Sequence, residues 1–396
     1  SEAPAAPAAA AAPSPPRSRA RSPVSVAGAL RGRAARLLEG SGVTLDGAQP
    51  WDLQVRDSRL FARVLTHGSL GFGDAYVDGW WEAADLSGCL QRLVAHGVDA
   101  RVAGLPGRLV AWRHRLANAQ RGGRGWTVGR RHYDLGDDLF AAMLGTRLVY
   151  SCAYWAEATD LDAAQVAKLD LVCRKLGLEP GMRVLDIGCG WGEALKYAAE
   201  KYGVRGVGVT ISARQAEYAR RSCAALPVEI RLADYRTVDE RFDRILSIGM
   251  FEHVGWHNYA RYFDVAGRCL GPEGLFLLHT IGTQCGARTP DPWIERHIFP
   301  NSMIPRLDDV VTAAMPRFVI EDLQNFGLDY IRTLEAWRER FDQAWPRLEA
   351  HYGAAFRRLW GYYLAASIAS FAAGRNHLWQ WVMAPHGRHS VYRGCR

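Results

Sequence analysis

Three glycines alternate with larger residues in the run Asp186-Ile-Gly-Cys-Gly-Trp-Gly192, which follows the apolar pair 184–185. Such a run, followed by the helix-like segment 193–201, is typical of a buried parallel strand, a tight turn and a helix that bind a nucleotide-like ligand. A dinucleotide site needs the spacing G-x-G-x-x-G. The spacing here differs, and Asp186 suits a positively charged amino-acid group. We therefore predict S-adenosylmethionine as the ligand; the alternative is a glycine-rich turn without one.

The residues after the other predicted strands indicate the rest of this site, because ligands of open α/β sheets bind at the carboxyl ends of the strands. Asp234, after the third strand, is expected to accept a hydrogen bond from an adenine amino group. Thr210 and Ser212, after the second, are explained equally well as caps of the next helix. Glu252 follows the fourth strand, and His279 ends the fifth. A lone strand histidine is more often a core residue, but its place at the cofactor end favours a catalytic role.

These motifs need a sheet to position them, and the chain from residue 182 onward alternates strand and helix patterns. Sequential βαβ units of this length predict a doubly wound α/β fold with a parallel sheet. A helix that stops or kinks at Pro346 and a longer helix at 351–373 are expected to follow. Strands are predicted at 183–187, 205–209, 227–231, 243–248, 274–280 and 378–383, and helices at 192–201, 213–224, 258–269, 305–315 and 333–345.

Composition limits the class of protein and its surroundings. The 396 residues allow two or three domains with ample apolar content for a core. No apolar stretch approaches the roughly 20 residues that span a bilayer, which predicts a soluble protein, at most peripheral to a membrane. The eight cysteines are scattered without a C-x-x-C pair, which indicates reduced thiols in a cytoplasm rather than a disulfide scaffold.

The net charge of +8 is unevenly distributed along the chain. Between Arg101 and Arg131 there are eight arginines and no acidic residue, interleaved with leucines and tryptophans. Such a segment suits an anionic surface, either nucleic acid or phospholipid headgroups. Composition alone slightly favours a solvated basic helix, whereas the tryptophans favour a lipid surface, where aromatic side chains sit at headgroup level.

Composition also divides the chain into three regions. Residues 1–23 are rich in Ala, Pro and Ser and predict a disordered tail, whose prolines exclude a secretory signal. Residues 24–125 are expected to form a lipid-docking N-terminal domain, with tight turns in its glycine-rich part, and the basic linker. Residues 126–396 are expected to form the catalytic domain.

Several motifs carry a resemblance to a known family. They are Tyr150-Ser-Cys-Ala-Tyr-Trp155, Val184-Leu-Asp-Ile-Gly-Cys-Gly-Trp-Gly192, Gly208-Val-Thr-Ile-Ser212, Gly249-Met-Phe-Glu-His-Val-Gly255, Leu277-Leu-His-Thr-Ile-Gly282, Trp293-Ile with Ile298-Phe-Pro-Asn301, and Asn325-Phe-Gly with Asp329-Tyr330. Together they resemble the cyclopropane-fatty-acyl-phospholipid synthases, and the similarity runs from about residue 52 to 383. Asp78-Gly-Trp-Trp81 resembles the N-terminal domain of the bacterial phospholipid enzymes, which the related mycolic acid cyclopropane synthases lack. The resemblance implies a Rossmann-like class I S-adenosylmethionine-dependent methyltransferase sheet with a smaller N-terminal domain.

The resemblance also implies a reaction and the residues that perform it. A methyl group passes from S-adenosylmethionine to a cis double bond of a phospholipid acyl chain, and the resulting carbocation closes to a cyclopropane ring as bound bicarbonate removes a proton. No metal takes part. The implied bicarbonate cradle is Cys152, Glu252, His279, Tyr330 and the backbone of Ile281. The implied cofactor contacts are Tyr133, Tyr150, Ser151, Gly188, Gly190, Thr210, Gln215, Asp234 and Tyr235.

Several alternatives remain beside this hypothesis. The same scaffold supports C-methylation of the double bond to a branched chain, although the complete bicarbonate set favours ring closure. That set also disfavours a lipid-binding protein without catalysis, and nucleic-acid methylation lacks an RRM, KH or helix-turn-helix signature. The aromatic residues at 293–299 and 351–373 are expected to line an acyl-chain channel or, equally well, to pack in the core.

The same reasoning gives expectations for partners and location. We expect an anionic phospholipid bilayer surface as the partner and no nucleic acid. A homodimer is expected because two basic surfaces gain avidity at a membrane. The expected location is cytoplasmic, at the inner face of the cytoplasmic membrane.

Overall fold

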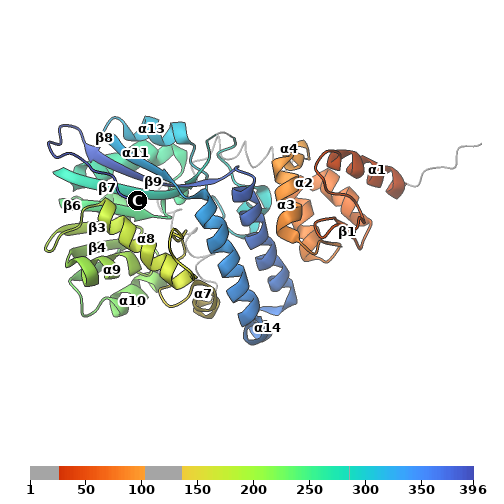
Figure 1. Cartoon of the computed structure of the whole chain (residues 1–396), viewed down its shortest axis with the longest axis horizontal. Helices are drawn as coiled ribbons and strands as arrows, with labels where there is room; N and C mark the ends of the chain where they lie inside the picture. The colour runs from red at the N-terminus through yellow and green to blue at the C-terminus, as the bar shows by residue number, and fades with distance from the viewer. Residues whose placement is uncertain (1–25, 103–135, 285) are drawn as a thin grey trace, which may run out of the picture.

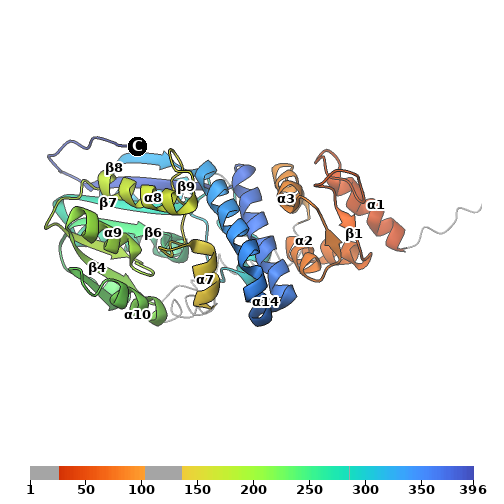
Figure 2. The same ribbon diagram turned by 60° about the horizontal axis from the view of Figure 1, so that its bottom comes forward.

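The computed structural model describes residues 26–102, 136–284 and 286–396. Figure 1 and Figure 2 show a sheet at one end of the molecule, a small helical unit at the other, and the long helix α14 between them. The predicted tail 1–23 and nearly all of the predicted basic segment lie outside the described residues.

The sheet has seven strands in the order β5-β4-β3-β6-β7-β9-β8. The first five are parallel, and β9 runs antiparallel to both of its neighbours. The predicted strands between 183 and 248 agree with β3 to β6 to within one residue, and β8 is an edge strand that we did not predict. The strands are β3 (Arg183–Ile187), β4 (Arg205–Thr210), β5 (Val228–Leu232), β6 (Phe242–Ile248), β7 (Leu270–Gly282), β8 (Phe318–Asn325) and β9 (His377–Pro385).

Helices cover both faces of the sheet, as the buried runs of its strands require. On β3, Val184 packs with the helices α8 to α10, whereas the next residue, Leu185, packs with α11 and α13 on the other face. Figure 1 shows the two helical layers. The helices are α7 (Asp137–Leu144), α8 (Leu161–Lys175), α9 (Glu193–Tyr202), α10 (Ala213–Ser222), α11 (Tyr259–Cys269), α12 (Pro292–His297) and α13 (Leu307–Ala314).

Helix α14 (Gly327–Ala372) consists of two halves that lie side by side (Figure 2). The chain turns back at Gly353, whose φ is +74°. The helix does not stop at Pro346, because this proline lies inside it. A proline removes only one backbone hydrogen bond, whereas a reversal needs a left-handed backbone that glycine adopts without strain.

The N-terminal unit, residues 26–102, packs against α14. Of the tight turns expected in the stretch 61–81, one lies at Gly79, whose φ is +77°, whereas residues 68–73 are part of α2, which breaks at Gly68. Arg358 of α14 donates to the carbonyls of Tyr76, at 2.8 Å, and Trp81, at 3.3 Å. In addition, one hydrophobic core continues from this unit into α14. The elements of the unit are α1 (Val26–Leu38), β1 (Gln54–Val55), α2 (Arg59–Val77), β2 (Trp81–Glu82), α3 (Leu86–Ala95) and α4 (Val98–Arg101).

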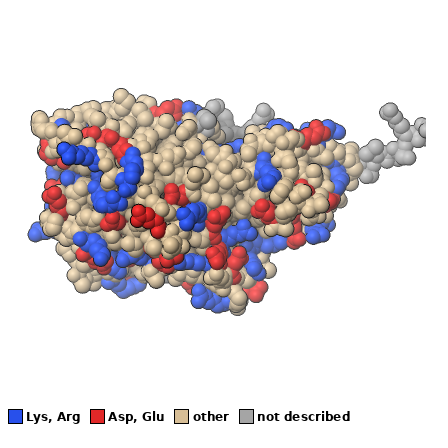
Figure 3. Space-filling model, viewed as in Figure 1, with Lys and Arg blue, Asp and Glu red and all other residues tan. Residues whose placement is uncertain are grey.

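Two features of the structure concern the predicted association with a membrane surface. Within residues 26–102, 136–284 and 286–396, no helix combines the length and the apolar character needed to cross a bilayer. Basic and acidic side chains are interspersed over the face that Figure 3 shows.

Candidate active site

A pocket opens at the carboxyl ends of β3 to β6, where we expect the ligand. Tyr133 lies outside the described residues. All eight of the other predicted cofactor contacts line the pocket: Tyr150, Ser151, Gly188, Gly190, Thr210, Gln215, Asp234 and Tyr235. The fold thus brings together residues that are up to 85 positions apart in the sequence. Their binding of a cofactor stays a prediction.

The turn after β3 depends on Gly188, whose φ is +89°. A Cβ at this position would stand 2.5 Å from Cγ of Met250, so neither the backbone nor the available space accepts a larger residue. The N–H groups of Gly188 and Cys189 both donate to the carbonyl of Val209 at 3.0 Å. These bonds tie the glycine turn to β4, the neighbouring wall of the pocket.

Thr210, the last residue of β4, and Ser212 serve both of the purposes considered above, which are capping the next helix and lining the pocket. Ser212 caps α10, because its Oγ accepts the backbone N–H of Gln215 at 3.4 Å. Thr210 Oγ1 accepts the backbone N–H of Ser212 at 3.2 Å and donates to Oε1 of Gln215 at 3.5 Å. Thr210 therefore closes the turn and also orients Gln215 in the pocket wall.

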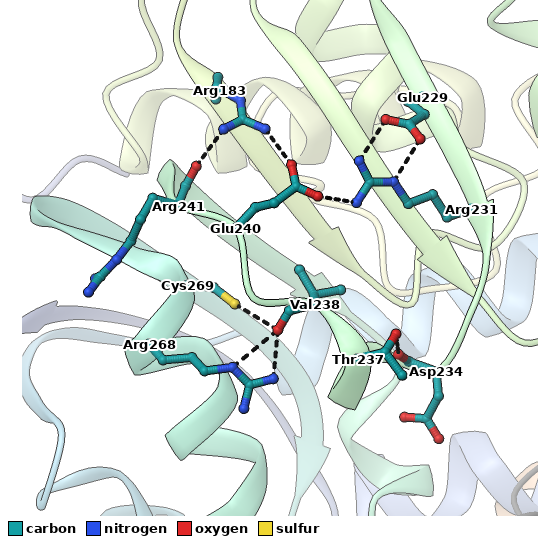
Figure 4. Close-up of polar contacts among 10 residues, drawn as sticks. All are labelled: Arg183, Glu229, Arg231, Asp234, Thr237, Val238, Glu240, Arg241, Arg268 and Cys269. Carbon is teal, nitrogen blue, oxygen red and sulfur yellow. Dashed lines mark hydrogen bonds and ion pairs between the residues drawn. The ribbon is translucent and has the colours of Figure 1, made fainter.

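The segment between β5 and β6, which begins at Asp234, is held at several points (Figure 4). The carbonyl of Val238 accepts side-chain hydrogen bonds from α11. Glu240 bridges Arg183 at the start of β3 and Arg231 of β5. These contacts fix the path of the segment that carries Asp234 and Tyr235 to the pocket.

The carboxylate of Asp234 already has a partner in Arg236. Nε of Arg236 donates to Oδ1 at 2.8 Å, and the backbone N–H of Arg236 donates to the same oxygen at 3.0 Å. Burial raises the pKa of Asp234, but the hydrogen bonds from Arg236 outweigh it and hold the pKa below its usual value. The carboxylate is therefore ionised, and an adenine amino group would share it with Arg236.

The loop that carries Tyr150 and Ser151 is fixed from two sides. The hydroxyl of Tyr150 lies 2.8 Å from that of Tyr363, in the second half of α14. From α8, the side-chain amide of Gln165 donates to the carbonyl of Ser151 at 2.9 Å, and Nζ of Lys168 donates to Oγ of Ser151 at 2.8 Å. Both of the helices that pack on this loop therefore set its position in the pocket.

Two of the five predicted cradle residues, Glu252 and Ile281, are in direct contact. Oε1 of Glu252 accepts the backbone N–H of Ile281 at 2.7 Å. Oε2 is buried and has no hydrogen-bond partner within the described part of the chain. Burial raises the pKa of Glu252 to about 7, although the hydrogen bond from Ile281 opposes this shift.

A third cradle residue, His279, has a defined tautomer. Its Nδ1 lies 3.2 Å from Nε2 of Gln380, on β9. The amide nitrogen can only donate, so Nδ1 accepts and Nε2 carries the ring proton. Burial holds the pKa of His279 well below its usual value, so the ring is neutral. The Nε2–H group is buried without a partner among the residues that the structure describes.

The last two cradle residues are Cys152, in the loop before α8, and Tyr330, on α14. A hydrogen bond between their neighbours ties the loop to this helix. Thr333, one turn after Tyr330, accepts the backbone N–H of Ala153 at 3.1 Å. Sγ of Cys152 donates to the carbonyl of Ala153, also at 3.1 Å, and burial raises the pKa of this thiol well above its usual value. Cys152 is therefore a protonated thiol and not a nucleophile. None of the five cradle residues lines the pocket itself.

Comparison with known proteins identifies the family. Residues 121–381 match the family model described as mycolic acid cyclopropane synthetase. The chain belongs to this family.

Three members of the family or their solved structures are similar to this chain over most of their length. Cyclopropane-fatty-acyl-phospholipid synthase of Escherichia coli (strain K12) is 46% identical over 361 residues, which cover 89% of this chain and 92% of that protein. Tuberculostearic acid methyltransferase UfaA1 of Mycobacterium tuberculosis (strain ATCC 25618 / H37Rv) is 33% identical over 384 residues, with 89% of this chain and 88% of that protein covered. The solved structure of mycolic acid cyclopropane synthase CmaA1 complexed with SAH and CTAB has a TM-score of 0.61 and 33% identity, covering 65% of this chain and 97% of that one.

These matches confirm two predictions. The chain is an S-adenosylmethionine-dependent methyltransferase of the cyclopropane synthase family, and its α/β sheet is the one found in methyltransferases of this kind. The alignment with the E. coli enzyme covers more of the chain than the family model does, so it extends beyond residues 121–381.

Sequence motifs do not identify Lys168, which lines the pocket of this family member and is only 1% exposed. Helix α8, which carries it, is also absent from our predictions. The inward side of α8 includes the buried residues Gln165, Lys168 and Lys175, so the helix lacks the apolar periodicity of a surface helix. The spacing of Lys168 and Lys175 is the signal that could have indicated a helix with both lysines on its inward face, because residues seven apart share one helix face.

The aromatic residues predicted for an acyl-chain channel divide into two groups. The ring of Phe299 lies 6.2 Å from that of His253, a pocket residue, and 5.9 Å from that of Tyr363. Trp293 is fully buried, with its ring 4.5 Å from that of Tyr362. Phe299 and Tyr363 thus lie beside the pocket, whereas Trp293 packs in the core where α12 meets the N-terminal unit.

Proposed function

We propose that this enzyme transfers a methylene group from S-adenosylmethionine to the cis double bond of an unsaturated phospholipid acyl chain and forms a cyclopropane ring. The observation that carries the proposal is the identity of 46% with the E. coli phospholipid enzyme over 89% of the chain. The eight predicted cofactor contacts around one pocket support the same function.

The reaction makes two demands on the protein. The sulfonium methyl carbon bonds to one alkene carbon, S-adenosylhomocysteine leaves, and a carbocation remains at the other alkene carbon. Loss of a proton from the new methyl group then supplies the electron pair that closes the ring. An alkene is a weak nucleophile, so the chain must be aligned with the methyl group, and water must be kept from the cation. The burial of Glu252 and His279 suits the second demand.

We propose that Cys152, Glu252, His279, Tyr330 and the backbone of Ile281 hold a bicarbonate ion, which supplies the base for ring closure. The unpaired buried atoms support this assignment: Nε2–H of His279 is a donor, and Oε2 of Glu252 is an acceptor, or a donor when protonated. Buried polar atoms without partners are costly, so a small ligand with both donor and acceptor atoms suits them. Glu252 would lie against the protonated oxygen of that ligand.

A second candidate function is C-methylation of the double bond to a branched chain. It is favoured by the identity of 33% with the tuberculostearic acid methyltransferase over 89% of this chain. The two functions share the methyl transfer and differ in the fate of the carbocation. The higher identity with the phospholipid enzyme places ring closure first.

We further propose that the enzyme acts in the cytoplasm as a homodimer, at the inner face of the cytoplasmic membrane, on anionic phospholipid. The eight arginines between Arg101 and Arg131 support this proposal, because they would attract an anionic surface. Residues 24–125, as a docking domain with a basic linker, would then bring the acyl chain to the catalytic domain 126–396.

Mass spectrometry of the lipid product tests the function. The purified protein is incubated with methyl-labelled S-adenosylmethionine and vesicles of monounsaturated anionic phospholipid, with saturated vesicles as the control. We expect each modified chain to gain one CH2 and to give ring-specific fragments. A methyl-branched fragmentation pattern would favour the second candidate, and unlabelled lipid with bound cofactor would exclude both.

A further inference from the structure

Lys168 is a buried cation beside the cofactor pocket, and the reaction proposed above gives it no role. Its Nζ donates a hydrogen bond to Oγ of Ser151 at 2.8 Å. Burial lowers the pKa of Lys168 to about 7, whereas Asp186 opposes this shift. An ammonium group in such a place is costly unless anions or strong acceptors compensate it. The lysine therefore needs a compensating group that Ser151 alone does not supply.

The hydrogen bond from Lys168 fixes the polarity of the Ser151 hydroxyl. An ammonium group has only donors, so Oγ of Ser151 must accept, and its own O–H proton points elsewhere. Ser151 lines the pocket, and its hydroxyl has no second hydrogen-bond partner among the described residues. Polarisation by the lysine strengthens this donor. The pocket wall therefore presents a hydroxyl donor that is suited to an anion.

The charges around the pocket indicate which anion. Glu193 is paired with Arg147 at 3.2 Å, and Asp234 is paired with Arg236. Lys168 and Asp186 remain, and both line the same pocket. Burial raises the pKa of Asp186 to about 8 and lowers that of Lys168 to about 7, so neither group is held fully charged by the protein alone. Oδ1 of Asp186 is buried without a partner in the described part of the chain. An α-amino-acid zwitterion carries an ammonium and a carboxylate on one carbon, and such a ligand would favour the charged forms of both Asp186 and Lys168.

We propose that Lys168 and Ser151 form a relay that binds the carboxylate of the methionine part of S-adenosylmethionine. Lys168 is a positioning residue, because it acts through the Ser151 hydroxyl, which makes the contact. Asp186 takes the ammonium group of the same zwitterion. Gln165, one turn earlier on α8, holds the carbonyl of Ser151 at 2.9 Å, so that α8 fixes both ends of this residue. The inference rests on the cofactor pocket proposed above.

Two ligands that differ only in the carboxylate test the relay. We would measure the affinities of S-adenosylmethionine and decarboxylated S-adenosylmethionine by calorimetry for the full chain, K168M, S151A and the double variant. K168M and S151A are each expected to weaken S-adenosylmethionine binding by about tenfold or more, because a hydrogen bond to a charged group is lost. The decarboxylated ligand should change less than about twofold. The double variant should lose little more than either single variant, because the two residues act in series.

K175M is the matched control, since Lys175 is an equally buried lysine on the same helix and does not line the pocket. It should leave both affinities within about twofold. Thermal unfolding would show which variants fold, and S151A, which removes one oxygen atom, keeps the test open where K168M does not fold. Equal weakening of both ligands, or none, would overturn the relay alone. A wild-type chain that binds neither ligand would overturn the proposed pocket as well.

Discussion

Oε1 of Glu252 accepts the backbone N–H of Ile281 at 2.7 Å, and this bond links the residues that follow β6 to the end of β7. Both residues belong to the proposed bicarbonate cradle. Glu252 therefore already accepts the hydrogen bond from the N–H group of Ile281, which an anion bound in that cradle would also accept. The pKa of about 7 leaves the carboxyl close to half-protonated at neutral pH, so it can act there as a donor or an acceptor.

Replacing Glu252 with glutamine should remove most of the turnover. E252Q keeps the size of the side chain but cannot ionise, so we expect a loss of about 100-fold or more in the rate of lipid labelling. The affinity for S-adenosylhomocysteine should fall only modestly, because Glu252 does not line the pocket. E295Q, at a buried glutamate of α12, is the control and should retain activity. Unchanged turnover in E252Q would contradict the cradle.

The same substitution should change how stability depends on pH. The pKa of Glu252 is raised in the folded state, so between about pH 4.5 and 7 the unfolded chain loses its proton first, and the contribution of Glu252 to stability falls as pH rises. Glutamine has no such loss. Relative to wild type, E252Q should gain up to about 3 kcal/mol between pH 4 and pH 8. Urea unfolding of both proteins at the two pH values measures the gain, and a constant difference would contradict the shift.

Gly188 should tolerate no side chain. An alanine there would adopt a left-handed φ and place its Cβ 2.5 Å from Cγ of Met250. G181A is the control, because Gly181 has a similar φ of +84° with no atom within 4 Å of an added Cβ. We expect G181A to cost about 1 kcal/mol of stability, whereas G188A should cost more and also weaken cofactor binding. Equal unfolding free energies and affinities for the two variants would be evidence against this account.

Arg358 should be a main anchor between α14 and the N-terminal unit. Its guanidinium donates to two carbonyls of that unit and lies 3.4 Å from Glu82. R358A should lower the free energy of unfolding by about 1–3 kcal/mol, because two part-buried carbonyls lose their donor. R357A, next to it, removes an exposed ion pair at 3.7 Å and a cation–π contact with the ring of Trp345, and should change stability by about 1 kcal/mol or less. Chemical denaturation of both variants would measure the difference, and a similar effect in both would refute the anchor.

The sequence by itself determined the parallel strands β3 to β6 and the position of the pocket at their carboxyl ends. The alternation of strand and helix patterns located β3 to β6 to within one residue, because sequential βαβ units have a recognisable spacing. The order of parallel strands then required Gly188, Thr210 and Asp234 to meet at one edge. Spacing within a short segment was enough for each of these steps.

Only the tertiary structure decided which side chains touch across segments. Lys168 meets Ser151, and Glu252 meets the N–H of Ile281, because α8 and β7 pack against loops distant in the chain. The reversal of α14 fell at Gly353 rather than Pro346, since a left-handed residue was needed where the helix turns back against its first half. Spacing along the chain indicates on which face of a helix or strand a residue lies. The position of a buried charged side chain, however, depends on the group that compensates its charge, and folding brings that group from another segment.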